Sequence, residues 1–509
     1  MHDQNFLKRL FRSALAITIS AFLATCGEAA DRLARPNVLL IAVDDLRPEL
    51  GCFGVREVLS PNIDRLASDG MIFRHAYVQQ AVCGPSRASL LTGLRPDSSR
   101  VQDNAQRLSE ACPDAVSLPR HFKNHGYHAV SLGKIYHWPG DDDGAWSEPD
   151  WRPFNMSPSS REYRDPESWR AMRALRSEAE RRGAKLAALD TYKGPAYESL
   201  DLPDGVYPDG LIADMAVHTL RRLNGQDQPF FLAVGFYKPH LPFACPTAYW
   251  DIYDPETITP RLESPPRDMP PVAFVDSEEL RQYQGIPALG EAVDEGLART
   301  LIHGYRACVS YMDAQVGRVL DELDRLDLAD DTIVVLLGDH GWHLGEQGIW
   351  GKQTNFERAT RSTLIVRGLD TKAKGQACDA LVEFVDIYPT LCELAALEVP
   401  ERLEGQSFAA LLDEPTRAWK SAAFSQYPRG KPTKHLGRSM RTERYRFTRW
   451  VEIDDPSKVV GLELYDHQSD PREKRNLAAE PEFTEVVRQL GEQLDRGWRG
   501  ARASRTIAN

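Results

Sequence analysis

The sequence predicts an α/β protein with a mainly parallel central sheet flanked by helices and a smaller C-terminal α+β subdomain. Five continuous apolar runs suit strands buried on both faces, at residues 38–43, 127–132, 229–236, 332–338 and 363–368. Helical patterns lie between them, including the apolar series Ile212, Ala216 and Leu220. Strands that alternate with helices indicate a parallel sheet. At 509 residues and 42% hydrophobic composition, the chain can build a large core and more than one domain.

Residues 1–30 read as a targeting segment that does not belong to the fold. Lys8, Arg9 and Arg12 form a basic start, and the apolar run "ALAITISAFLA" that follows is too short to span a bilayer. We therefore expect an exported protein, either periplasmic or secreted. The box "LATC" resembles a bacterial lipoprotein cleavage site, which leaves simple cleavage and lipidation of Cys26 as alternatives; membrane attachment is expected only with the lipid.

The rest of the chain divides into a main domain over residues 31–420 and a subdomain over residues 421–509. Two stretches of the main domain, 139–210 and 251–287, are rich in Pro, Asp, Ser and Arg, and we interpret them as surface insertions of the kind that often carry binding function. The first contains a helical pattern at residues 167–189. In the subdomain, "MRTERYRFTRW" and "GLELYDH" are typical of antiparallel strands, and residues 482–498 of a closing helix.

Charge and cysteine content narrow the function classes. A net charge of -12 and a pI near 5.6 argue against nucleic-acid binding, which needs a basic face, but leave a small anionic substrate open. Besides Cys26, the chain has seven cysteines with neither a CxxC pair nor a zinc spacing: Cys52, Cys83, Cys112, Cys245, Cys308, Cys378 and Cys392. For all but Cys83 we expect buried thiols with at most one bridge.

Acidic residues follow two of the predicted strands. The run "VLLIAV" leads directly into Asp44 and Asp45, and "TIVVLLG" leads into Asp339 and His340. Ligands of open α/β sheets gather beyond the carboxyl ends of strands, so these four side chains are expected to converge. Such an oxygen-rich set suits Ca²⁺, with Mg²⁺ as the alternative, better than Zn²⁺. An Asp pair in this position is also typical of a turn or a helix cap.

The stretch "AVCGPSRASLLTG" explains why Cys83 differs from the other cysteines. Its "CGPSR" matches the Cys-x-Pro-Ser-Arg signature at which sulfatases have their cysteine oxidised to formylglycine, and "LLTG" follows as it does in that family. The chain thus resembles a type I sulfatase. The resemblance implies a formylglycine-generating enzyme as a maturation partner, whereas the alternative interpretation is an ordinary thiol at a helix start.

The resemblance extends from "RPNVLLIAVDDLRPELGCFG" to "LYDHQSDPREKRNLA" and is strongest with the iduronate-2-sulfatase group. Motifs similar to that group are "SLGKIYHWPG", "GFYKPHLPF" and "GDHGWHLGEQGIWGKQTNFE". The likeness implies the alkaline-phosphatase-like sulfatase fold, with residues 31–420 as the catalytic domain, and one Ca²⁺ per subunit. Its implied ligands are Asp44, Asp45, Asp339, His340 and the modified Cys83, and its implied active-site residues are Arg87, Lys134, His137, His240 and Lys352.

Sulfate-ester chemistry gives each of these residues a role. Hydrated formylglycine offers one hydroxyl that attacks sulfur and a second through which sulfate is released, which a thiol cannot provide. The cation, Lys134, Lys352 and Arg87 would stabilise the transferred group, and Lys238 is a weaker candidate for contact with an anionic substrate. His240 is expected to protonate the leaving oxygen and His137 to act as base in the second step.

Three function classes stay open at this stage. A sulfatase accounts for the full set of residues, and sulfated uronic acid or hexose units of a glycosaminoglycan or an algal polysaccharide are the expected substrates. A phosphoesterase or phosphonate hydrolase of the same superfamily would share the sheet and the metal site. A non-catalytic binder of sulfated glycans would keep the cations but lose the nucleophile or the acid. The sequence does not decode the sugar, the sulfate position, exo or endo action, or the oligomeric state.

Overall fold

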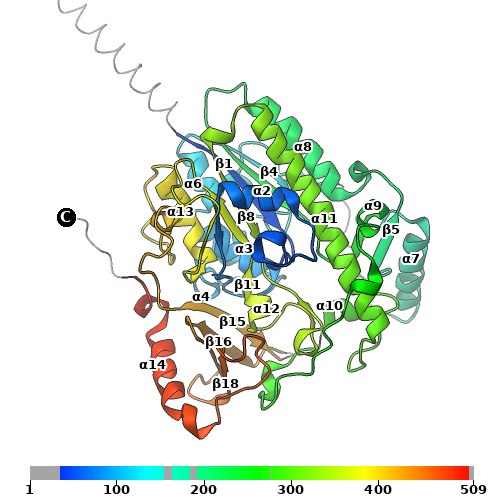
Figure 1. Ribbon diagram of the computed structural model, residues 1–509, viewed down its shortest axis with the longest axis vertical. Helices are drawn as coiled ribbons and strands as arrows, with labels where there is room; N and C mark the ends of the chain where they lie inside the picture. The colour runs from blue at the N-terminus through cyan, green and yellow to red at the C-terminus, as the bar shows by residue number, and fades with distance from the viewer. Residues whose placement is uncertain (1–34, 154–162, 184–191, 277, 431, 504–509) are drawn as a thin grey trace, which may run out of the picture.

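A seven-stranded sheet forms the centre of the computed structural model, which describes residues 35–153, 163–183, 192–276, 278–430 and 432–503 (Figure 1). The targeting segment expected at residues 1–30, with Cys26, lies outside these ranges. The strand order is β13-β2-β12-β8-β1-β6-β4. The bounds of these strands are Asn37–Val43 (β1), Met71–Phe73 (β2), His128–Gly133 (β4), Phe230–Phe236 (β6), Thr332–Gly338 (β8), Leu364–Arg367 (β12) and Gln376–Cys378 (β13).

The five strands predicted from apolar runs are β1, β4, β6, β8 and β12, each within two residues of the expected bounds. Neighbours β4, β6, β1 and β8 pair in parallel, whereas β12 runs antiparallel to both β8 and β2. The prediction of a mainly parallel sheet is therefore confirmed. The three-residue strands β2 and β13 were too short to produce a sequence pattern.

Helices cover both faces of this sheet because its strands are apolar on both sides. One face carries α2 (Pro61–Asp69), α8 (Pro208–Leu223) and α11 (Glu295–Arg325), and α8 and α11 lie side by side. The other face carries α3 (Cys83–Thr92), α6 (Leu118–Asn124) and α13 (Ile387–Leu394). Alternate residues of β1 enter the two cores: Leu39, Ile41 and Val43 face the first, and Leu40 and Ala42 the second.

The remaining helices and strands of the main domain lie outside the seven-stranded sheet and the helices named above. The helices are α4 (Pro96–Ser99), α5 (Leu108–Ala111), α7 (Pro166–Arg181), α9 (Thr247–Trp250), α10 (Glu278–Arg281) and α12 (Glu357–Thr360). The strands are β3 (Ala76–Tyr77), β5 (Tyr197–Leu200), β7 (Phe243–Pro246), β9 (His343–Leu344), β10 (Trp350–Gly351), β11 (Arg361–Ser362) and β14 (Val382–Glu383). Helix α7 supplies the helix expected at 167–189 as far as Arg181, and residues 184–191 lie outside the described ranges.

The C-terminal region forms a separate antiparallel sheet packed against one helix (Figure 1). Its order is β15 (Ala423–Arg429), β16 (His435–Arg441), β17 (Tyr445–Glu452) and β18 (Val459–Asp466), followed by α14 (Thr484–Gly500). The stretch "MRTERYRFTRW" is not one strand as expected. It spans the end of β16, a turn and β17, because the Thr442 hydroxyl accepts the Tyr445 N–H at 2.9 Å and closes a hairpin.

Two further findings concern the cysteines and the membrane. All seven cysteines from Cys52 to Cys392 are free thiols, six of them buried and Cys52 partly so, and no disulfide joins them. Over the described part of the chain, none of the helices has both the length and the apolar character needed to cross a bilayer.

Candidate active site

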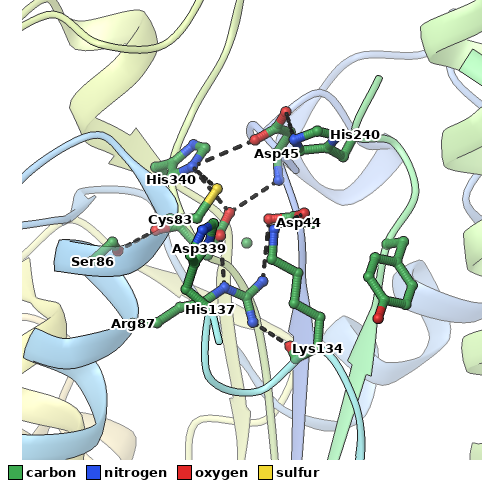
Figure 2. Close-up of polar contacts among 12 residues, drawn as sticks. Asp44, Asp45, Cys83, Ser86, Arg87, Lys134, His137, His240, Asp339 and His340 are labelled. Carbon is green, nitrogen blue, oxygen red and sulfur yellow. Dashed lines mark hydrogen bonds and ion pairs between the residues drawn. The ribbon is translucent and has the colours of Figure 1, made fainter. Parts of the chain in front are cut away.

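The two acidic strand ends meet at the carboxyl edge of the sheet, as the sequence predicted. Val43 of β1 pairs with Gly338 of β8, which places Asp44 and Asp45 beside Asp339 and His340. The Asp45 N–H donates to Asp339 Oδ1 at 3.0 Å. One oxygen from each of the three aspartates lies within 4.8 Å of the other two, and all three side chains are buried (Figure 2).

The acceptors of this cluster fit a divalent cation. Asp45 Oδ2 is buried and has no hydrogen-bond partner among the residues that the structure describes. His340 Nδ1 lies 3.0 Å from the Gly341 carbonyl, which can only accept, so the ring proton sits there and Nε2 points at Asp45 Oδ1 (3.4 Å) and Asp339 Oδ1 (3.5 Å). Burial raises the pKa of Asp45 although Lys352 acts to lower it. A cation among these atoms would satisfy all of them, and oxygen donors favour Ca²⁺ or Mg²⁺.

Cys83 stands at the start of α3, directly beside this cluster. Its Sγ lies 3.3 Å from His340 Nε2 and 3.4 Å from Lys352 Nζ, and the residue is 1% exposed. Burial and, next, the charge of Asp44 raise the pKa of this thiol well above its usual value. The residue is therefore placed as a reacting group, but as a thiol it stays neutral and is a poor nucleophile.

The predicted cations bind the carboxylates from two sides. Arg87 Nε donates to Asp339 Oδ2 at 2.8 Å, and Arg87 Nη2 donates to Asp44 Oδ1 at 3.3 Å. Its Nη1 donates to the backbone carbonyls of Lys134 and Ile135, so the charge of Arg87 acts through the carboxylates. Lys134 Nζ pairs with Asp44 Oδ2, and Lys352 Nζ pairs with Asp45 Oδ1 at 2.8 Å. Burial would raise the pKa of Asp44, but Lys134, His240 and Arg87 hold it well below its usual range.

A glycine near the end of β6 allows the turn after β4 to approach that strand, just before the turn that follows it. A Cβ on Gly235 would lie 2.1 Å from the Lys134 carbonyl oxygen, a distance that no side chain tolerates. The Lys134 N–H donates to the Gly235 carbonyl at 2.9 Å. Close contact of the two turns brings Lys134 to the carboxylates, since a larger residue at 235 would push the turn outward.

The two predicted histidines lie on these turns and differ in charge. His240 Nδ1 lies 2.6 Å from the Leu241 carbonyl, which fixes the ring proton there and turns Nε2 toward the cluster. Burial lowers the pKa of His240, but the charges of Asp45 and Asp44 and the contact with Glu279 together outweigh burial, and the pKa is raised overall. Burial and the charge of Lys134 lower the pKa of His137 to about 2, and its buried Nδ1 has no partner. His240 is thus suited to donate a proton, and His137 is held in its neutral form.

Lys238 holds the His240 turn in place. Its Nζ donates to the carbonyls of His240 at 2.9 Å and Pro242 at 2.7 Å, and the residue is 1% exposed. The sequence proposed it as a weaker contact for an anionic substrate, and these bonds place its charge behind the turn instead.

Glu279 is a site residue that the sequence analysis missed. It lies on α10, in the insertion at residues 251–287, and its Oε1 is 3.0 Å from His240 Nε2 while its Oε2 is 3.3 Å from Lys352 Nζ. The stretch around it, "DSEELRQ", resembles an exposed helical turn, so no sequence signal distinguished this carboxylate. The structure therefore adds an acidic group that contacts both His240 and Lys352.

Comparison with known proteins defines the class to which this fold and site belong. The Sulfatase family matches residues 36–397, and the family described as N-sulphoglucosamine sulphohydrolase, C-terminal, matches residues 345–499. The chain belongs to the sulfatase family, the enzymes that hydrolyse sulfuric esters. Human iduronate 2-sulfatase is 36% identical over 518 residues, which cover 87% of this chain and 90% of the human protein. The predicted resemblance to the iduronate-2-sulfatase group is therefore confirmed.

Solved structures confirm the predicted fold class. A 2-O GAG sulfatase superimposes with a TM-score of 0.67 at 24% identity and covers 91% of each chain. The phosphonate monoester hydrolase of Silicibacter pomeroyi reaches a TM-score of 0.71 at 22% identity and covers 93% of this chain and 97% of its own. At these identities the likeness concerns the fold alone, so the fold does not separate the two reactions.

Proposed function

We propose that this protein is an exported sulfatase that hydrolyses sulfate esters of carbohydrates, with Cys83 converted to formylglycine by a formylglycine-generating enzyme. The observation that carries the proposal is the position of Cys83: the one cysteine in the "CGPSR" signature is also the one whose sulfur contacts both His340 and Lys352. Hydrated formylglycine supplies a hydroxyl that attacks sulfur and a second one through which sulfate is released.

The residues that fit a cation are Asp44, Asp45, Asp339 and His340, together with the modified Cys83. A bound Ca²⁺ would supply Lewis-acid stabilisation of the sulfate oxygens. The chain itself supplies fixed positive charge at Lys134 and Lys352, both buried and both within hydrogen-bond distance of the aspartates. Buried cations that need no reorganisation stabilise the charge that develops on the transferred group.

His240 is proposed to donate the Nε2 proton to the leaving oxygen of the sugar. The Leu241 carbonyl fixes the ring so that Nε2 faces the cluster. His137, which is neutral, is proposed as the base that accepts a proton when sulfate is released. If so, His137→Ala should release about one equivalent of alcohol in a burst and then turn over slowly. A uniform slow release without a burst would show that His137 serves the first step.

The decisive experiment for the proposal is mass analysis of the Cys83 peptide from active protein, paired with the activity of Cys83→Ala. Conversion to formylglycine replaces the sulfur and two hydrogens of the thiol side chain by one oxygen, and the variant should lose activity on every sulfate ester. A fully active preparation that contains only the unmodified thiol would refute the mechanism.

Within sulfated carbohydrates, we propose the 2-O-sulfated uronic acid units of a glycosaminoglycan or a related polysaccharide as first substrates. The support is the likeness to human iduronate 2-sulfatase over most of both chains. Hydrolysis rates on a panel of defined sulfated oligosaccharides test it, and a preference for 6-O-sulfated hexosamines would contradict it.

A phosphonate or phosphate diester hydrolase is the second candidate, because a phosphonate monoester hydrolase shares the fold. The ratio of kcat/KM for an aryl sulfate to that for an aryl phosphonate separates the two, since a ratio below one would favour the phosphonate reaction.

Export and lipidation complete the proposal. The basic start and short apolar run of residues 1–30 support export, and "LATC" leaves a lipid on Cys26 as the alternative to simple cleavage. Cell fractionation of the full chain and of Cys26→Ser tests both: a lipid anchor requires that only the native chain be found with membranes.

A further inference from the structure

The Glu279 carboxylate contacts two groups that the proposed reaction uses, the proposed acid and one of the lysines. In the free enzyme its Oε1 lies 3.0 Å from His240 Nε2, the atom proposed to protonate the leaving oxygen. Its Oε2 lies 3.3 Å from Lys352 Nζ, which also contacts Cys83 Sγ at 3.4 Å. One carboxylate thus bridges the acid and a cation of the site in the same way as a bound anion would.

The position of Glu279 is fixed by its neighbours on α10. Leu280 is 1% exposed and packs in the core beside α11. The Arg281 guanidinium donates to the Pro287 carbonyl at 3.1 Å and to the Glu291 carbonyl at 2.7 Å. The two residues that follow Glu279 therefore anchor the helix, and the glutamate side chain, which is 24% exposed, is left to adjust.

The electrostatics of Glu279 agree with a charged carboxylate. Burial acts to raise its pKa, but Lys352 and then His240 lower it overall. A substrate that approaches Nε2 of His240 must take over these contacts. The carboxylate then lies beside the leaving alcohol and loses both of its donors, which is costly for a buried charge unless a new donor replaces them.

We propose that Glu279 is a specificity residue that selects sulfate esters whose leaving alcohol carries a free hydroxyl next to the sulfated carbon. Such a hydroxyl lies within one hydrogen-bond length of the leaving oxygen and donates to the displaced carboxylate. Sugars with vicinal hydroxyls provide it, and simple aryl or alkyl sulfates do not. The inference rests on the proposed sulfatase function and narrows its substrate class.

Two aryl sulfates that differ by this single hydroxyl test the proposal. In catechol monosulfate a hydroxyl stands beside the ester, and in phenyl sulfate that hydroxyl is missing. We expect the wild-type enzyme to prefer the catechol ester in kcat/KM. In Glu279→Gln the ratio of the two values should fall about tenfold, the effect of one hydrogen bond to a charged acceptor. The absolute value for phenyl sulfate should rise, because His240 and Lys352 are released.

Matched variants separate this role from a structural one. Glu279→Ala should lower the ratio as Gln does, and Glu279→Asp should retain part of it, because a carboxylate remains but is one methylene shorter. Glu256→Gln, an exposed glutamate of the same insertion, should leave both values unchanged. An equal change for both esters in Glu279→Gln, or no change in either, would overturn the proposal.

A binding measurement distinguishes failure of this inference from failure of the proposed function. Inorganic sulfate titrated calorimetrically should bind several-fold more tightly to Glu279→Gln than to the wild type, since it no longer competes with a carboxylate for Lys352 and His240. Equal or weaker sulfate binding would overturn the role of Glu279 even in protein that hydrolyses neither ester. Absence of ester hydrolysis together with tighter sulfate binding would count against the reaction and support this role.

Discussion

Two buried clusters of charged side chains lie at the two ends of the segment that runs from Lys352 to Glu357. They contain similar residue types but serve different purposes. The catalytic cluster is built on Asp44, Asp45 and Asp339. The second cluster, here called the subdomain joint, links the main domain to the C-terminal sheet through Glu357, Arg441, Arg446, His467 and Glu473. In each cluster at least three ligand-type side chains lie close enough together to hold a metal ion.

The difference between them is whether every buried acceptor has a donor. In the subdomain joint, Arg446 donates to both Glu357 and Glu473, Tyr77 donates to Glu357 at 2.9 Å, and His467 lies 3.0 Å from Glu473. None of their buried polar atoms is left without a partner, whereas Asp45 Oδ2 in the catalytic cluster is. A carboxylate cluster in which every acceptor is paired is a structural joint, and one in which an acceptor has no donor can hold an ion.

The largest expected effect follows from that open acceptor. Asp45→Asn should lower kcat/KM on sulfate esters about 1,000-fold or more, because the cation loses a charged ligand at the reacting centre. Added Ca²⁺ should raise the melting temperature of the wild type, since a ligand that binds only the folded state stabilises it, and should raise that of Asp45→Asn much less. Steady-state kinetics and thermal unfolding with and without a chelator measure both.

The subdomain joint provides the control for that experiment. Glu473→Gln should show the same Ca²⁺-induced rise in melting temperature as the wild type. A smaller rise in Glu473→Gln than in Asp45→Asn would mean that the ion binds at the joint, and the distinction between the two clusters would be lost.

The next effect concerns stability. The Arg446 side chain is 1% exposed and pairs with Glu357 and Glu473. Arg446→Met removes this cation, and we expect the substitution to lower the free energy of unfolding by about 3–5 kcal/mol. Arg438→Ala breaks an exposed pair with Asp97 on a neighbouring surface and should cost less than about 1 kcal/mol. Denaturant titration measures both. A similar small cost for the two variants would show that burial does not strengthen the joint.

Two histidines, each 3.0 Å from a glutamate, offer a finer comparison. His240 pairs with Glu279 in the site, and His467 pairs with Glu473 in the joint. His240→Ala should lose about 100-fold more kcat/KM on a sugar sulfate than on 4-nitrophenyl sulfate, because only the poor leaving group needs a proton. His467→Ala should lower stability and leave that ratio unchanged. If His240→Ala reduced both esters equally, its role as the acid would be wrong.

The sequence predicted the parts of the site that lie in short motifs. Asp44, Asp45, Asp339 and His340 follow continuous apolar strands, so their meeting follows from the edge of a parallel sheet. Glu279 could not be predicted in the same way, because it arrives from a polar insertion whose path over the surface depends on tertiary packing.

The fold, like the site, could be predicted where the signal lies in a short stretch of sequence and not where it depends on tertiary contacts. Strands buried on both faces left long apolar runs, but the antiparallel direction of β12 leaves no mark in a single sequence. The turn that separates β16 from β17 was missed because charged residues flank it on both sides and it contains neither glycine nor proline. The subdomain joint was missed as well, since Glu357 and Glu473 are 116 residues apart.

Glu463 shows a third way to bury a carboxylate, and it carries the smallest predicted effect. It is 2% exposed, accepts hydrogen bonds from Trp450 Nε1 at 2.6 Å and the Tyr465 hydroxyl at 2.9 Å, and burial raises its pKa to about 7. The folded state therefore binds the proton more tightly than the unfolded chain, so the stabilisation is complete below about pH 4.5 and is lost as the pH rises toward 7. Between pH 5 and pH 8 the free energy of unfolding of the wild type should fall by about 2 kcal/mol relative to Glu463→Gln, which cannot titrate there. Denaturant titrations at both pH values measure the difference, with Glu443→Gln in the exposed β16–β17 turn as the control. If the free energy of unfolding changed equally in Glu463→Gln and in the wild type between the two pH values, Glu463 would stay ionised in the folded state. Its two donors would then stabilise the carboxylate as fully as Arg446 stabilises the carboxylates of the joint.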